Sequence, residues 1–261
     1  MEEGHIDQRD VLDIAMEAGE ILLENGAEIS RVEETIDRIC RHFGVQSKNA
    51  FVLSNGIFLT AGNEREKRFA RVKQIPMHGA QLHRVAAVNQ LSREIEEGKY
   101  ELPELRKKLV SIRNQPGRPK KTRILMSGVG CGCFCLMFGG SLQDCLATFC
   151  IGIILYCYLL AVEGRFSKIV ENIGGGMVIT LLGLLFVNMP FGTDMSHMIS
   201  GAIMSLVPGV AFTNGIRDIA DGDYISGSVR MIDAILVFLS IAAGVGFVIG
   251  AYRQLTGGAV L

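Results

Sequence analysis

The sequence predicts an α+β cytosolic domain, residues 1–120, followed by an α-helical transmembrane domain of five spans, residues 121–261, with a Pro-Gly-broken fourth helix. Two observations lead to this fold class. Residues 122–261 hold only six of the 26 Lys and Arg residues, and the same region contains five long apolar segments. A shift in composition this strong indicates two domains in different solvents.

The composition also excludes some functions. A net charge of -1 gives no reason to expect a nucleic-acid partner. Residues 1–10 lack the basic start and apolar run of a secretion signal. Cys131, Cys133 and Cys135 are about 200° apart at each step on a helix, so we expect buried thiols rather than a metal site. No nucleotide-binding motif occurs, and we expect no cofactor.

The first domain opens with two helical segments. Apolar residues recur at helical spacing from Val11 to Leu22, and Gly26 is a suitable stop. Ser30 and Glu33 have the spacing of a capping box, in which each side chain satisfies a free backbone donor. The sequence therefore predicts that a second helix begins at this box.

Strands are expected next. Asn55-Gly56 lies between two apolar runs, which is a strong hairpin signal. Residues 68–75 alternate apolar and basic side chains, and this predicts a third, edge strand that Pro76 ends. A helix over 79–97 and a short helix over 102–112 complete the domain.

The catalytic candidates in this domain are weak. They are Glu64, Arg65, Glu66, His78 and His83. No nucleophile elbow, phosphate loop or zinc-protease motif accompanies them, so we expect a solvated structural role and no enzyme. A membrane-anchored enzyme or sensor, with the first domain as its active part, is the alternative function.

The second domain is predicted to cross a lipid bilayer, because a spanning helix needs about 20 mostly apolar residues. The five expected spans are Ile124–Gly140, Leu142–Val162, Ile173–Met189, Met198–Ile216 and Ile232–Tyr252. Basic residues precede the first span and follow the second and fourth. The positive-inside rule then places the first domain in the cytoplasm and the C-terminus outside.

Small residues in the spans are spaced for close helix contact. Gly128 and Gly132 share a face of the first span, and Ala242, Gly246 and Gly250 share a face of the fifth. Such spacing lets helix backbones approach within a bilayer. These faces predict contacts within the chain or with another subunit.

The candidate substrate site follows the break in the fourth span. Pro208 and Gly209 disfavour a continuous helix, and discontinuous helices often form substrate sites in transporters. If the helix resumes, Asn214, Arg217 and Asp218 share one face. Arg217 could bind a substrate carboxylate through two donors.

The other polar residues of this run have several possible roles. Thr213 and Asn214 could bind an amine or a hydroxyl. Asp218 could pair with Arg217, bind a substrate ammonium or carry a coupling proton, with Asp221 and Asp233 as further coupling candidates. A paired, structural position of Arg217 and Asp218 at the cytoplasmic interface is the alternative.

The chain resembles the threonine/serine exporter family in its N-terminal half. The segments that carry this resemblance are Ala18–Ala27, Arg31–Glu33, Val88–Leu91, Glu104–Ile112 and Pro208–Gly227. Their order and spacing together are specific, and they extend over nearly the whole chain.

The resemblance implies a multi-pass protein of the cytoplasmic (inner) membrane that exports small carboxylate-bearing metabolites, such as threonine, serine or the dicarboxylate succinate. It implies that Pro208, Gly209, Asn214, Arg217 and Asp218 form the family's most specific motif. The chain is similar to split members, in which a separate small membrane subunit supplies the other half, and a homo-oligomer is also possible. A proton gradient is the expected energy source.

Overall fold

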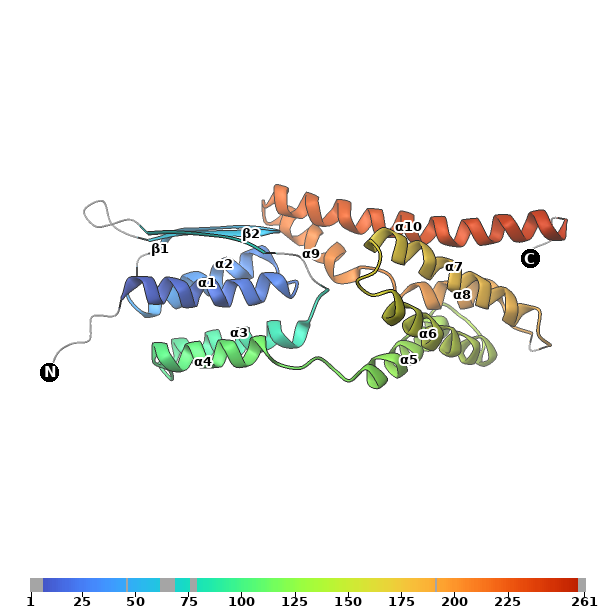
Figure 1. Ribbon diagram of the computed structural model, residues 1–261, viewed down its shortest axis with the longest axis horizontal. Helices are drawn as coiled ribbons and strands as arrows, with labels where there is room; N and C mark the ends of the chain where they lie inside the picture. Colours follow the sequence, from blue (N-terminus) through green and yellow to red (C-terminus); the bar gives the residue numbers. More distant parts are fainter. Residues whose placement is uncertain (1–6, 46, 62–68, 76–78, 191, 258–261) are drawn as a thin grey trace. The chain divides into compact units, whose positions relative to one another are not determined.

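The computed structural model describes residues 7–45, 47–61, 69–75, 79–190 and 192–257, which form two compact units (Figure 1). The first unit joins the chain up to Pro116 with residues 209–232. The second joins residues 117–208 with the chain from Asp233 onward. Each unit therefore contains segments that are far apart in the sequence.

The first unit consists of helices on one face of a small sheet. Its elements are α1 Gln8–Glu24, α2 Ile29–His42, β1 Ser47–Leu53, β2 Gly56–Ala61, β3 Phe69–Gln74, α3 Leu82–Glu96, α4 Leu102–Arg113, α9 Gly209–Ala220 and the first turns of α10, Tyr224–Thr256. Figure 1 shows α1 and α2 between the sheet on one side and α3 with α4 on the other. The sequence forms this core because the apolar stripes of α1 and α2 are buried from both sides.

Gly19 in α1 lies where three elements meet. A Cβ atom there would lie 2.7 Å from a side-chain carbon of Ile36 in α2 and 3.1 Å from one of Ile57 in β2. Only a glycine lets α1 approach both neighbours this closely. The absence of a side chain at this position thus fixes the spacing between the two helices and the sheet.

The sheet has the antiparallel order β1-β2-β3. Leu53 pairs with Gly56, so the two-residue turn is Ser54-Asn55, one residue earlier than the predicted Asn-Gly turn. The predicted hairpin and the third strand are both confirmed. The predicted helices over 79–97 and 102–112 correspond to α3 and α4.

The predicted start of α2 is wrong. The helix begins at Ile29, its N-cap is Glu28, and the Glu28 side chain makes no capping hydrogen bond. Glu33 accepts a hydrogen bond from the backbone amide of Val52 at 3.3 Å instead of forming a capping box. The acceptor that the helix start needs comes from elsewhere in the chain, as described below.

The second unit contains helices and no strand among its described residues. It contains α5 Lys120–Met137, α6 Leu142–Val162, α7 Lys168–Val187, α8 Met195–Ile203 and the remainder of α10. Its core includes Ile151 and Leu155 of α6, Ile179 of α7 and Met198 of α8, all fully buried. Asp144 and Ser141 form a complete capping box at the start of α6.

The predicted fold class of a cytosolic domain followed by five spans is wrong. Among the described residues only α6, α7 and α10 are long and apolar enough to cross a membrane. The 18 residues of α5 include three cations, Lys120, Lys121 and Arg123. The predicted fourth span divides into α8 and α9, of 9 and 12 residues, which at 1.5 Å per residue reach about 14 and 18 Å of a core about 30 Å thick.

Glycines decide how closely the helices of the second unit approach. A Cβ atom on Gly128 of α5 would lie 2.9 Å from the Phe149 carbonyl oxygen, and one on Gly132 would lie 3.1 Å from that of Cys145, so this predicted contact face is confirmed. On α10 the contact glycine is Gly244, whose Cβ would lie 2.1 Å from the Ile173 carbonyl oxygen. Gly246 faces open space among the described residues, so the expected face packs against no other helix of this chain.

Candidate functional site

The candidate site lies on α9, directly after the break in the chain. Helix α8 ends at Ile203, residues 204–208 are not helical, and α9 begins at Gly209. At the predicted break, Pro208 and Gly209, the chain therefore forms two separate helices and not one kinked helix. Thr213 donates its hydroxyl hydrogen back to the Gly209 carbonyl oxygen at 2.9 Å, within the first turn of α9.

Two glycines bring α9 against the start of α10. A Cβ atom on Gly227 of α10 would lie 2.5 Å from a side-chain carbon of Ile219 and 2.8 Å from the Gly215 carbonyl oxygen. A Cβ atom on Gly215 would lie 3.3 Å from the Gly227 carbonyl oxygen. The two helices cross with their backbones nearly in contact, and this crossing places Asp218 beside Arg230.

Asp218 and Arg230 form a buried ion pair. The Asp218 Oδ2 and Arg230 NH1 atoms are 2.9 Å apart, and the two side chains are 1% and 6% exposed. Neither of these two atoms has a hydrogen-bond partner among the described residues, so the contact is one of charge. Breaking such a pair leaves an uncompensated buried charge.

The other carboxylate oxygen of Asp218 caps α2. Asp218 Oδ1 accepts a hydrogen bond from the Ile29 backbone amide at 3.3 Å. Burial raises the pKa of Asp218, and the negative charges of Asp223 and Glu28 raise it further. The Arg230 cation and the Ile29 amide lower it, and the pKa lies above its ordinary value of 3.8.

The remaining polar residues of the site contact the turn between α1 and α2, residues 25–28. Asn214 donates from Nδ2 to the Gly26 carbonyl oxygen at 2.8 Å, and Arg230 donates from NH2 to the Ala27 carbonyl oxygen at 2.9 Å. Arg217 forms an ion pair with Glu28. Gly26 has a φ of 84°, a left-handed conformation that favours glycine and turns the chain here.

The predicted site residues thus divide into groups. Asn214, Arg217 and Asp218 come together against the α1–α2 turn, as their shared helix face predicts. Asp221 is exposed after the end of α9. Asp233 belongs to the second unit, where its Oδ2 lies 2.6 Å from Lys168 Nζ.

Sequence reasoning missed two members of the site, Arg230 and Glu28. The available signal for Arg230 was a single cation near the start of a long apolar helix, which needs a partner when it is buried. Glu28 gave no signal, because an acid before a helix is common on a protein surface. Of the weak catalytic candidates, His83 is exposed on α3, and Glu64, Arg65, Glu66 and His78 lie outside the described residues.

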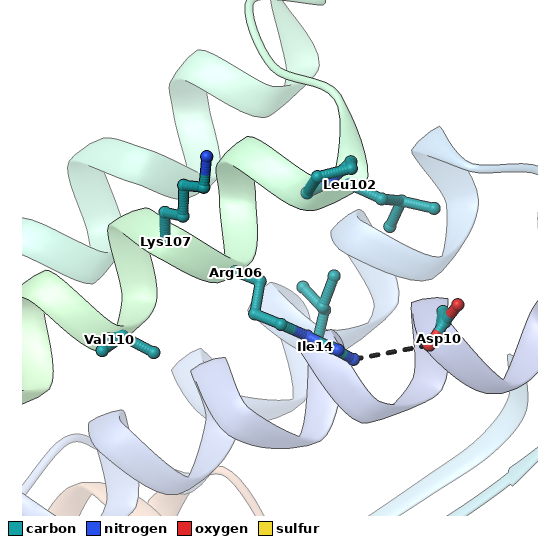
Figure 2. A pocket seen from close by; sticks show the side chains of 7 residues that line it. Asp10, Ile14, Leu102, Arg106, Lys107 and Val110 are labelled. Carbon is teal, nitrogen blue, oxygen red and sulfur yellow. Dashed lines mark hydrogen bonds and ion pairs between the residues drawn. The ribbon is translucent and has the colours of Figure 1, made fainter.

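Two surface grooves of the first unit lie away from this site. The larger, of about 440 Å³, is shown in Figure 2 and is lined by Asp10, Ile14, Leu102, Pro103, Arg106, Lys107 and Val110. Arg106 reaches across it to Asp10 at 3.4 Å. The second, of about 340 Å³, includes Glu20, whose two oxygens contact Lys73 and Arg113. No predicted site residue lines either groove.

A cluster of uncharged polar side chains lies in the second unit, at the non-helical residues 204–208. Ser205, in the non-helical segment, has its hydroxyl 2.9 Å from the Cys131 sulfur and 3.5 Å from the Ser127 hydroxyl, both on α5. These groups offer weak donors and acceptors but no charge. No group of three or more His, Cys, Asp or Glu side chains in the described part of the chain could hold a metal ion.

Comparison with known proteins gives a consistent result. The family model described as "putative threonine/serine exporter" matches residues 13–252. A probable succinate transporter subunit YjjP of Klebsiella aerogenes is 27% identical over 242 residues, which cover 92% of this chain and 93% of that protein. The protein of the same name from Escherichia coli K12 is 27% identical over 241 residues, or 91% and 93%. No solved structure matches the chain.

These names are those of membrane transporters and not of enzymes. They confirm the prediction that the chain is no enzyme, and with the three apolar helices they identify it as a membrane protein.

Proposed function

The chain belongs to the threonine/serine exporter family, and we propose that it is one subunit of a two-component exporter whose substrate is a small dicarboxylate such as succinate. The observation that supports this substrate is the name of the two relatives, which match along almost their whole length. Threonine and serine, the substrates in the family description, are the second candidates.

The proposed partner is a separate small membrane subunit. The word "subunit" in the relatives' names supports it. The part of the chain that the structure describes also contains only three candidate spans, which are few beside transporter folds that are commonly built from two repeats of several helices. A homo-oligomer of this chain is the other arrangement to test.

Arg217 is the residue that we propose binds a substrate carboxylate. Its side chain is 57% exposed, so an incoming anion can reach the guanidinium, and its partner in the chain is itself a carboxylate. Thr213 and Asn214 lie on the same short helix and would contact the remainder of the substrate. Pro208 and Gly209 mark the break in the chain at which this helix begins.

We propose Asp218 as the main carrier of a coupling proton, with Asp221 and Asp233 as lesser candidates. A buried carboxylate with a raised pKa is suited to bind and release a proton, and its Arg230 partner would be affected by each change of charge. Asp221 is exposed, and Asp233 is paired with Lys168.

The orientation of the chain is a further part of the proposal. We place it in the cytoplasmic membrane, with the residues before α5 in the cytoplasm and the C-terminus outside. The eight Lys and Arg residues between 106 and 123 support this side, because basic segments next to a membrane are retained in the cytoplasm. A reporter that is active only outside the cytoplasm, fused after Thr256, should be active. An inactive fusion would mean that the C-terminus lies in the cytoplasm, the opposite of the proposed orientation.

The experiment that tests the function is efflux of labelled succinate, threonine and serine from cells that make this chain alone or with its candidate partner. We expect succinate efflux only when both are present. Efflux from this chain alone would exclude the two-component form, and efflux of threonine or serine only would change the substrate. Arg217→Gln should raise the half-saturating substrate concentration at unchanged membrane abundance.

The coupling role of Asp218 needs a test that separates it from stability. Asp218→Asn alone leaves Arg230 buried without a partner, so its activity must be compared with that of Asp218→Asn/Arg230→Gln, in which both charges are removed. If Asp218 carries the proton, the double variant accumulates normally in the membrane but does not export against a gradient. Wild-type export by the double variant would reduce Asp218 to a structural residue.

A further inference from the structure

The ion pair between Arg217 and Glu28 has a feature that the other contacts of the site lack. Asn214, Asp218 and Arg230 each contact backbone atoms of the α1–α2 turn or of the start of α2, which are fixed in place. Arg217 contacts a side-chain carboxylate. Glu28 therefore offers Arg217 a carboxylate, the same chemical group as the one in the substrate that Arg217 is proposed to bind.

We propose that Glu28 is an internal competitor that occupies Arg217 until a substrate carboxylate displaces it, and so sets the substrate concentration at which export begins. This inference rests on the proposed function of Arg217. The class of ligand is a small carboxylate that pairs with the Arg217 guanidinium, as the Oε1 atom of Glu28 does.

The exposure of the two side chains supports displacement. The Arg217 side chain is 57% exposed, so an anion from solvent can reach its guanidinium. The Glu28 side chain is only 17% exposed. An ion pair with one exposed partner is weak enough for a substrate carboxylate at millimolar concentration to compete for the guanidinium. The Asp218–Arg230 pair, at 1% and 6% exposure, is closed to such exchange.

Glu28 also has a second partner to move to. Arg31, one turn along α2, lies 3.9 Å from its other carboxylate oxygen and is 41% exposed. A displaced Glu28 therefore remains paired within the α2 helix, and the α1–α2 turn keeps its contacts with Asn214, Asp218 and Arg230. Displacement of Glu28 therefore breaks few contacts of the fold, so it is suited to repeated cycles of substrate binding and release.

The test is the half-saturating concentration of labelled succinate for uptake into inverted membrane vesicles that contain this chain and its partner subunit. Glu28→Gln removes the competing charge while keeping the side-chain shape, and should lower that concentration about two- to fivefold at an unchanged maximal rate. Glu28→Asp, whose shorter side chain retracts from Arg217, should give an intermediate value. Glu34→Gln, an exposed acid of α2 paired with Arg38, is the control and should match wild type.

The combination with Arg217 shows how Glu28 acts. In an Arg217→Gln background, Glu28→Gln should have no further effect, because there is no guanidinium to compete for. An unchanged or raised half-saturating concentration in both Glu28 variants, with Arg217→Gln still harmful, would overturn the competitor role alone. Wild-type half-saturation in Arg217→Gln would instead overturn the proposed role of Arg217 and the inference with it.

Discussion

The carboxylate of Asp218 accepts a hydrogen bond from the backbone amide of Ile29, 189 positions earlier in the chain. The start of α2 has free amides and a partial positive charge, and its own N-cap side chain does not satisfy them. A residue of α9 therefore completes a helix of the first unit. Asp218 is part of the structural framework of that unit, in addition to the coupling role that we propose for it.

The first prediction concerns the Asp218–Arg230 pair. Asp218→Asn should lower the free energy of unfolding by about 3 kcal/mol, because Arg230 stays buried and charged without its partner. Asp218→Leu/Arg230→Met, which removes both charges, should recover most of that loss. The measurement is thermal or denaturant unfolding of the purified protein in detergent, with the exposed Asp221→Asn as a neutral control. A stable Asp218→Asn would contradict the buried pair.

The second prediction concerns the stability of the first unit in acid. Burial raises the pKa of Glu20, but hydrogen bonds and charges from Lys73 and Arg113 outweigh it and hold the pKa below its ordinary value of 4.5. The lowered pKa means that ionised Glu20 stabilises the fold at pH values above 4.5. This stabilisation is lost as the pH falls through the lower, folded-state pKa.

Glu20→Gln tests this prediction. The difference in unfolding free energy between wild type and Glu20→Gln should be constant from pH 7 to about pH 5 and should shrink toward pH 3. Glu34→Gln, on an acid that is 64% exposed, is the matched control. A difference that does not change across the acid range would mean that Glu20 is not ionised in the folded protein.

The third prediction compares two glycines of α10. Gly244→Ala should destabilise the second unit by about 2 kcal/mol or more, because the added Cβ would lie 2.1 Å from a backbone oxygen of α7. Gly246→Ala, two residues away, adds its Cβ to open space and should be neutral for the folding of this chain. Melting temperatures of the two variants in the same detergent give the comparison. Equal effects would mean that α7 and α10 are farther apart than the structure has them.

The fourth prediction concerns the crossing of α9 and α10. Gly227→Ala forces a Cβ atom to within 2.5 Å of Ile219, so the two helices must separate and Asp218 must move from Arg230. We expect a loss of about 1–3 kcal/mol in stability and a drop in export activity per molecule. Ser228→Ala, at the exposed next position, controls for the substitution itself. Full activity in Gly227→Ala would show that the site tolerates separation of these helices.

Local patterns predicted local structure well in this chain. The hairpin followed from apolar runs around Asn55-Gly56, and α4 followed from leucines at helical spacing, because both depend on neighbouring residues. The start of α2 was missed, since its acceptor, Asp218, is supplied from far along the chain. The shared face of Asn214, Arg217 and Asp218 was predictable from spacing, but its contacts with the α1–α2 turn were not.

The five-span prediction failed for a related reason. Counting apolar residues joined α8 and α9 into one span, although Pro208 separates them and α9 belongs to the first unit. On α10 the spacing indicated the face of Gly246, whereas the contact within this chain is made at Gly244, because spacing within one helix does not reveal where its neighbour lies. Arg230 could have been suspected as a lone cation, but its partner could not have been named from the sequence.

The division of the first unit between two distant segments has a consequence for how the protein is made. Residues up to Pro116 leave the ribosome well before residues 209–232, which complete their fold. At about 5–20 residues per second, the early segment waits on the order of ten seconds with the Ile29 amide and the Gly26 and Ala27 carbonyl oxygens still solvated. The first unit therefore cannot be completed until the helices α5 to α8 have been synthesised, which makes its assembly a late step in the biogenesis of the protein.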